Sequence, residues 1–360
     1  MVENLDRSRY QLDFLCKGGE EGPLAPQFKA FGSKVFLAPL SPTHIGFINK
    51  ARKIIKEGEY DIIHNHIETY SWLGVYLARQ FNIPVITSFH NTDISPQHRA
   101  LRLPAIRQLR ALYGNVSIKY AVRNSDAVTS ISPGVTEFLK NNYGADPDKV
   151  ILVTYGVKMR PHASEEEKKI FRKELGFGEN TKIVLHVGRF LEQKNHFGLV
   201  RIAKTVLKKR ADTGFVLIGD GPLKSKVERY IKSNDVKKSF RLLKGRDDIP
   251  YFMTHSDLFF LPSLFEGLGL VLLEASAAGL PIVATDVEAI RFAAKNGESG
   301  ILCPIEREDE FAAAIATLLD DRDYWEEISR KGSEFVAGRF TIEHSVKGLM
   351  NLYDSIVKQR

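Results

Sequence analysis

Short apolar runs of strand length recur along the chain, and segments with helical periodicity separate them. Because parallel strands need long crossover connections, which are usually helices, this alternation predicts an α/β fold. A charged stretch at 165–169 falls between two groups of such runs, so we expect two doubly wound, Rossmann-like units. The expected strands are 10–15, 34–37, 62–64, 85–88, 127–131 and 150–153, then 183–187, 215–218, 240–243, 258–261 and 282–284.

The length of the chain also favours two domains. With 360 residues and 43% hydrophobic content, it exceeds one ordinary core. No apolar run approaches the roughly 20 residues of a membrane-spanning helix, and the first residues lack the apolar segment of a signal peptide. Because the two cysteines, Cys16 and Cys303, lie far apart in sequence, no disulfide framework is expected. A reducing cytoplasm is therefore the expected location.

Two glutamates, Glu266 and Glu274, stand eight positions apart around a glycine-containing turn between a strand and a helix. The first backbone N–H groups of a helix lack internal partners and carry its positive dipole end, so this turn suits a phosphate. Glu266 is placed to accept hydrogen bonds from sugar hydroxyls, and Glu274, about two turns further on, can reach a second polyol. The alternative is that Glu266 caps the helix and Glu274 is solvated. The expected backbone donors are Gly267, Leu268, Gly269 and Leu270.

A second cluster follows the apolar run 183–187, where Gly188 and Arg189 precede Lys194. An arginine fork and a lysine point charge near an anion-binding helix end would form a diphosphate clamp. Taken alone, such a basic pair is more often solvated surface. The neighbouring glutamate motif favours the clamp.

These motifs resemble those of glycosyltransferase family 4, retaining enzymes with the GT-B fold, in which two Rossmann-like domains face a cleft. The resemblance extends over nearly the whole chain. It implies that Glu266 contacts the transferred sugar, Glu274 the nucleotide ribose, and Arg189 with Lys194 the diphosphate. It also implies that no metal takes part.

Two further loops match the family. The turn 219–222, which contains Gly221, matches its Gly-Asp-Gly-Pro turn, and the segment 245–248, which contains Arg246, matches the loop that frames the base. The resemblance divides the chain into an N-terminal acceptor-side domain at 1–157, a C-terminal nucleotide-sugar domain at 158–340, and a terminal helix at 341–360 that returns to the first domain.

The N-terminal end departs from the family pattern. Relatives begin with an additional strand, a glycine-rich loop and a helix before the segment matching residues 6–15, and these are not found here. In a doubly wound sheet such a strand is central. We therefore expect an incomplete N-terminal sheet, which puts the activity of the chain in question.

Histidines follow two predicted strands of the first domain. His90 matches a histidine that faces the donor sugar in the family and is taken as catalytic, whereas His66 and His64 are more readily structural. The spacing of these three does not suit zinc. The Asp-x-Asp sequence at 146–148 is expected to be a turn rather than a metal site.

The net charge of +7 is unevenly distributed, since residues 94–125 contain no acidic side chain. Arginines interleaved with apolar residues there suit an interfacial helix on anionic lipid. Nucleic acid is a competing partner without a recognised motif, and a solvated helix face is equally open. The membrane hypothesis rests on Arg99, Arg102, Arg107 and Arg110.

Together these features and the resemblance predict a metal-independent retaining glycosyltransferase. It would move a sugar from a nucleotide diphosphate, UDP being favoured, to an acceptor hydroxyl in polysaccharide, glycolipid or other glycoconjugate synthesis. The expected location is the cytoplasm, with peripheral attachment to the inner face of the membrane left open. One alternative is a non-catalytic nucleotide-sugar-binding or membrane-associated fragment. Another is a different GT-B enzyme, such as a sugar-nucleotide epimerase.

Overall fold

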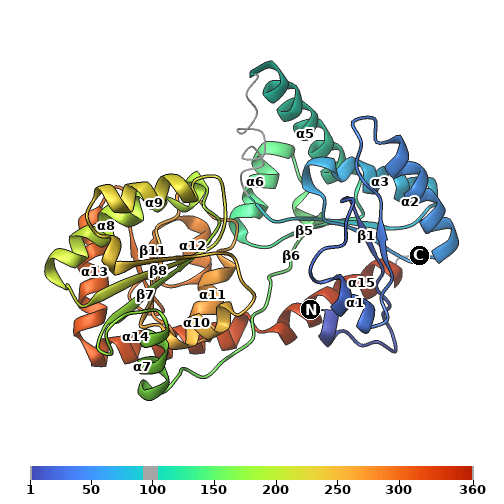
Figure 1. Ribbon diagram of the computed structural model, residues 1–360. Coiled ribbons are helices and arrows are strands. Elements are labelled where there is room, and N and C mark those ends of the chain that lie inside the picture. The colour runs from blue at the N-terminus through green and yellow to red at the C-terminus, as the bar shows by residue number, and fades with distance from the viewer. Residues whose placement is uncertain (1, 92–103, 359–360) are drawn as a thin grey trace. The chain divides into compact units, whose positions relative to one another are not determined.

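A computed structural model describes residues 2–91 and 104–358 (Figure 1). The chain divides into two compact units. Unit 1 comprises Met1–Gly156 together with Ile342–Arg360, and unit 2 comprises Val157–Thr341. These limits lie within one residue of the domain boundaries predicted from the sequence.

The strands of unit 1 form two separate parallel sheets. One has the order β3-β4-β5-β6 and the other pairs β1 with β2. The predicted strand 10–15 began too early, because Tyr10 turns its side chain to Asp354 and only the last residues pair. The strands are β1 Phe14–Cys16, β2 Val35–Leu37, β3 Ile63–Asn65, β4 Val85–Phe89, β5 Ala127–Ser130 and β6 Val150–Leu152.

The terminal helix α15, Ile342–Lys358, belongs to unit 1. Its apolar side chains recur at helical spacing, so one face is buried against Ile86 of β4 and Ala127 of β5. The buried side chains are Leu349, Leu352, Tyr353 and Ile356. The other helices of unit 1 are α1 Ala25–Ala30, α2 Ile45–Gly58, α3 Ser71–Gln80, α5 Pro104–Asn124 and α6 Pro133–Tyr143, with short 3₁₀ turns η1 Val2–Asn4, η2 Glu68–Tyr70 and η3 Pro147–Lys149.

Unit 2 contains one six-stranded parallel sheet with the order β12-β11-β10-β7-β8-β9. Helices cover both faces of this sheet (Figure 1). Successive side chains of a strand point to opposite faces, and neighbouring residues such as Val184 and Leu185 accordingly belong to different buried clusters. The edge strand β12 was not predicted from the sequence. The strands are β7 Lys182–Val187, β8 Thr213–Ile218, β9 Phe240–Leu243, β10 Leu258–Leu261, β11 Ile282–Thr285 and β12 Ile301–Cys303.

The helices of unit 2 follow its strands and complete the doubly wound pattern. They are α7 Glu165–Glu174, α8 His196–Lys209, α9 Lys224–Ser233, α10 Ile249–His255, α11 Leu270–Ala277, α12 Glu288–Ala293, α13 Glu308–Asp320 and α14 Arg322–Arg339, with 3₁₀ turns η4 Glu192–Lys194 and η5 Lys237–Ser239.

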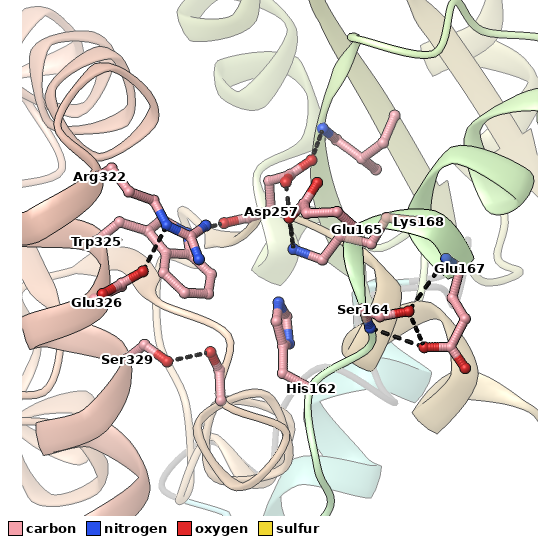
Figure 2. Close-up of polar contacts among 12 residues, drawn as sticks. His162, Ser164, Glu165, Glu167, Lys168, Asp257, Arg322, Trp325, Glu326 and Ser329 are labelled. Atoms are coloured by element: carbon pink, nitrogen blue, oxygen red, sulfur yellow. Dashed lines mark hydrogen bonds and ion pairs between the residues drawn. The ribbon is translucent and has the colours of Figure 1, made fainter.

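The charged stretch before β7 forms α7, the first helix of unit 2, and buried charges anchor it (Figure 2). Lys168 and Arg172 of this helix both approach the buried carboxylate of Asp257, at 3.6 and 3.2 Å. A capping box of Ser164 and Glu167 begins the helix. Because removing one partner of a buried pair leaves an uncompensated charge, these contacts fix α7 to the sheet.

Candidate functional site

Two predicted site loops of unit 2 meet. The loop leaving β7 contacts the turn leaving β10 through three polar interactions. The Leu264 N–H donates to the Gln193 carbonyl at 2.8 Å, and the Gln193 side-chain amide donates to the Phe265 carbonyl at 3.0 Å. Lys194 and Glu266 form an ion pair, with 2.5 Å between Nζ and Oε1. The two motifs that the sequence analysis expected to act together are thus in direct contact in the structure.

The Lys194–Glu266 pair is largely shielded from solvent, since its side chains are 14% and 8% exposed. The sequence motifs predict separate ligand partners for these two residues, diphosphate for the lysine and sugar for the glutamate. Their contact adds that each charge is balanced by the other. A ligand bringing its own phosphate and hydroxyl groups would compete with this pair.

Arg189 lies in the same loop and is exposed. Within residues 2–91 and 104–358, its guanidinium makes no hydrogen bond or ion pair with another residue. The next residue, Phe190, is fully buried and holds the loop onto the unit. Arg189 is thus an exposed cation on an anchored loop, and its guanidinium is available to a ligand.

The helix α11 begins immediately after the glutamate turn. Its N-cap residue, Gly269, has a left-handed φ of 71°, and no side chain caps the helix. Leu268 just before it is buried. This end offers backbone donors and the positive dipole end at the place predicted for phosphate.

Glu274 occupies an exposed position of α11, whereas its neighbours Leu273 and Ala275 are buried. The residue as a whole is therefore accessible to solvent, although neighbouring groups partly desolvate its carboxyl. Desolvation raises the pKa of the Glu274 carboxyl, and the charge of Arg160 partly opposes this. Among the described residues, no side chain or backbone group makes a hydrogen bond to this carboxylate, so it is suited to accept from a polyol.

Glycines allow two site loops to pack closely. A side chain at Gly219 would place its Cβ 2.1 Å from the Gly188 carbonyl oxygen, and one at Gly221 would lie 2.6 Å from that of Phe190. Asp220 between them accepts a hydrogen bond from the Gly245 N–H at 2.7 Å. These contacts tie the three loops leaving β7, β8 and β9 together.

The side chain of Arg246, in the predicted base-framing loop, is already engaged. It forms a two-pronged ion pair with Asp248 and lies over the Phe252 ring, 4.5 Å from its centroid. Its contribution to a ligand would therefore come through backbone atoms of this loop.

In unit 1, His90 follows β4 and uses both ring nitrogens. Its Nε2 lies 3.1 Å from Nδ1 of His66, and its Nδ1 lies 3.1 Å from the hydroxyl of Tyr155. Burial lowers the pKa of His90, while the nearby charge of Glu68 opposes this. Neither Glu68 nor Tyr155 was predicted from the sequence, because no local pattern marks either residue.

Two other sequence candidates have structural partners. The ring of His64 bridges the Tyr353 hydroxyl at 2.8 Å and the Ser88 hydroxyl at 2.6 Å, as expected for a structural histidine. Asp146 caps the 3₁₀ turn η3 through the Asp148 N–H. The prediction of a turn at 146–148 is confirmed.

The basic segment is described from residue 104 onward, so Arg99 and Arg102 lie outside the described residues. Arg107 and Arg110 lie on α5 and are exposed. The same helix exposes apolar side chains, which the sequence pattern alone did not separate from its buried ones. These are Ile106, Leu109, Leu112, Val116 and Tyr120.

Comparison with known proteins agrees with this geometry. Residues 167–335 match the family model described as Glycosyl transferases group 1, and residues 1–160 match Glycosyltransferase Family 4. The chain belongs to the glycosyltransferases of family 4 and has the GT-B fold. It is an enzyme that transfers a sugar to an acceptor.

Among curated relatives, a UDP-Gal:alpha-D-GlcNAc-diphosphoundecaprenol alpha-1,3-galactosyltransferase of Escherichia coli is 27% identical over 99% of this chain and 92% of its own length. An N-acetyl-alpha-D-glucosaminyl L-malate synthase of Bacillus anthracis is 25% identical over 88% and 80%. Among solved structures, Anabaena Alr3699/HepE in complex with UDP and glucose superposes with a TM-score of 0.79 at 19% identity, covering 96% of this chain and 99% of that one.

Proposed function

We propose that this glycosyltransferase uses a UDP-sugar donor and transfers the sugar with retention of anomeric configuration. The observation that supports this most is the contact between the two donor loops. The Lys194–Glu266 ion pair joins them, and the loop that carries Lys194 also carries the exposed Arg189. The named donor of the Escherichia coli relative and the UDP complex of the Anabaena structure support the choice of UDP.

In this proposal the leaving diphosphate is stabilised by Arg189, Lys194 and the N-terminal end of α11. Preorganised cations and backbone donors lower the energy of developing charge without reorganisation. Glu266 accepts from the transferred sugar, and Glu274 from the ribose. These positive groups do the work that a metal ion does elsewhere, so chelation by EDTA should leave turnover unchanged. Loss of activity with EDTA, restored by a divalent cation, would contradict this.

We further propose that the acceptor is a lipid-linked saccharide and that the enzyme works in the cytoplasm at an anionic membrane surface. The acceptor named for the Escherichia coli relative is lipid-linked. The exposed apolar and basic residues of α5 supply a suitable contact surface. In the described residues, no helix is long and apolar enough to cross a bilayer.

The test is a donor screen on the purified chain, with membrane lipid extracts as acceptor and mass spectrometry of the products. We expect one UDP-sugar to be consumed and one lipid-linked glycan to gain the mass of that sugar. Binding of UDP without any turnover would favour the non-catalytic fragment, and conversion of the free UDP-sugar to an epimer would favour the epimerase.

A further inference from the structure

The surroundings of His90 form a fixed hydrogen-bonded array within unit 1. The imidazole lies between two nearly parallel rings, with centroids 5.3 Å from His66 and 5.6 Å from Tyr155. Both of its nitrogens have a partner at 3.1 Å on these same residues. The ring is therefore held along its edges and cannot turn without breaking both contacts.

The backbone of His90 is held separately. Glu68 accepts through one carboxylate oxygen from the His90 N–H at 3.1 Å and from the Asn91 side-chain amide at 3.2 Å. Glu68 itself has φ of 38°, in the left-handed region that non-glycine residues rarely adopt. Such strain persists only where the surrounding structure enforces it, and it concentrates at functional sites.

The hydrogen-bond partners of His90 suit one tautomer of its ring. In the part of the chain that the structure describes, the Tyr155 hydroxyl has the Nδ1 atom of His90 as its hydrogen-bond partner. Burial, with the Glu68 charge adding to it, raises the pKa of Tyr155 to about 12, so the phenol keeps its proton. A protonated phenol can donate to Nδ1, and we assign it as the donor. His90 then carries its own proton on Nε2 and donates to Nδ1 of His66.

We propose that Glu68 and Tyr155 are positioning residues for His90, holding it as the neutral imidazole with Nε2–H directed outward to donate to a sugar hydroxyl. A substrate oxygen replaces His66 as the acceptor of that hydrogen bond. His90 acts only as a hydrogen-bond donor in this arrangement and does not transfer its proton. The inference rests on the proposed function, since it requires a sugar donor, and it takes His90 as the histidine that the family resemblance places beside the transferred sugar.

The surrounding charges are consistent with a neutral ring. Burial disfavours the charged form of His90, while the charge of Glu68 favours it. His66 lies beside the ring and is itself neutral at pH 7, because burial lowers its pKa to about 4. Removing the Glu68 charge should lower the pKa of His90 further. Removing the Tyr155 hydroxyl should release Nδ1 and allow both tautomers.

Nitrogen-15 histidine NMR on the full chain tests this directly. At pH 7 we expect wild-type His90 to show a protonated Nε2 and an unprotonated Nδ1. Tyr155→Phe should shift the spectrum toward a tautomer mixture, and Glu68→Gln should lower the His90 pKa. Glu57→Gln, an exposed carboxylate of the same unit, is the control and should do neither. Unchanged His90 signals in both Tyr155→Phe and Glu68→Gln would overturn the proposal.

Transfer kinetics separate this inference from the proposed function. Glu68→Gln and Tyr155→Phe should each lower kcat by about 10-fold or more while the donor KM stays within about threefold, as expected for a hydrogen bond used in the transition state. If the wild-type chain transfers no sugar but the NMR changes occur, the proposed function fails and the positioning role stands. If transfer occurs and both variants retain full kcat, the positioning role fails.

Discussion

The Lys194–Glu266 pair shows why individual site residues differ in what they do for the fold. The two charges neutralise each other in a shielded position, whereas Arg189 is exposed and, among the described residues, makes no polar side-chain contact. Loss of one member of a shielded pair leaves the other desolvated without compensation. Loss of a solvated cation carries no such penalty.

Lys194→Ala should therefore lower the free energy of unfolding by about 1–3 kcal/mol, and Arg189→Ala should change it by less than about 0.5 kcal/mol. Both should lower turnover by about 100-fold, because each removes a cation from the leaving diphosphate. Urea unfolding and initial-rate assays measure the two effects. The double variant Lys194→Met with Glu266→Gln is the control and should recover stability but not turnover. Equal stability of the two single variants would contradict the shielding argument.

Glu274 and Glu266 should separate binding from transfer. Glu274→Ala should weaken UDP binding by about 1.5–3 kcal/mol, the cost of a charge-assisted hydrogen bond to the ribose. Glu266→Gln should abolish transfer, because Glu266 is proposed to contact the sugar. It should leave UDP affinity nearly unchanged, because Lys194 keeps its charge for the diphosphate. Calorimetric titration with UDP measures both. Equal losses of affinity would refute the separate roles.

The raised pKa of Glu274 also predicts that the stability of the fold depends on pH. Because desolvation raises its pKa, the folded chain holds this proton more tightly than the unfolded chain. Its contribution to stability is then present below the unfolded pKa and is lost as the pH rises through the folded value. At pH 7 Glu274→Gln should therefore unfold at a higher temperature than wild type, with the difference vanishing in acid. A lower unfolding temperature at pH 7 would show that Arg160 outweighs desolvation.

At the scale of elements, the sequence predicted most strands from their apolar runs, including the three-residue strands β2, β3 and β6, but local patterns did not define every strand. The strand β10 was placed correctly, whereas β12 was missed and β1 was begun too early. Glu68 and Tyr155 were missed for a related reason. Their contacts to His90 span 22 and 65 positions, so only the folded sheet brings them together.

Gly219→Ala and Gly221→Ala test the packing of the donor loops. Either Cβ would enter the van der Waals shell of a backbone carbonyl, at 2.1 and 2.6 Å, which a side-chain rotation cannot relieve. We expect a loss of about 1–3 kcal/mol in stability, as for overpacking, together with weaker UDP binding. Gly348→Ala is a matched control within α15, where the added Cβ meets open space. It should stabilise by about 0.5–1 kcal/mol, and destabilisation there would undermine the comparison.

At the scale of the whole molecule, the alternation of strands and helices was enough to predict two α/β units, and the units that the structure forms end within one residue of the predicted boundaries. The charge excess was readable as well, since it is a sum over the sequence. What the sequence did not reveal is which apolar residues of the basic segment remain exposed. That depends on which face of α5 packs against its own unit.

The exposed residues of α5 predict binding to anionic membranes. Leu109, Leu112 and Val116 are 66%, 61% and 61% exposed. At about 100° per residue they lie within roughly 60° of one another on the helix surface. The described part of this helix carries four basic residues and no acidic one: Arg107, Arg110, Lys119 and Arg123. Apolar insertion and attraction to lipid headgroups would act together on this surface.

Sedimentation with anionic and neutral vesicles at low and high salt measures this binding. Each exposed basic residue near such a surface contributes about 1 kcal/mol before screening, so binding should require anionic lipid and weaken with salt. Arg107→Gln with Arg110→Gln should reduce it, and Leu109→Gln with Leu112→Gln should reduce it further at high salt, where only the apolar contact remains. Ile170→Gln, which removes a 53% exposed apolar residue from α7, should bind as wild type does. If the wild-type chain ignores anionic lipid, or if the α5 variants bind equally well, the helix is ordinary solvated surface and a soluble acceptor becomes the better hypothesis.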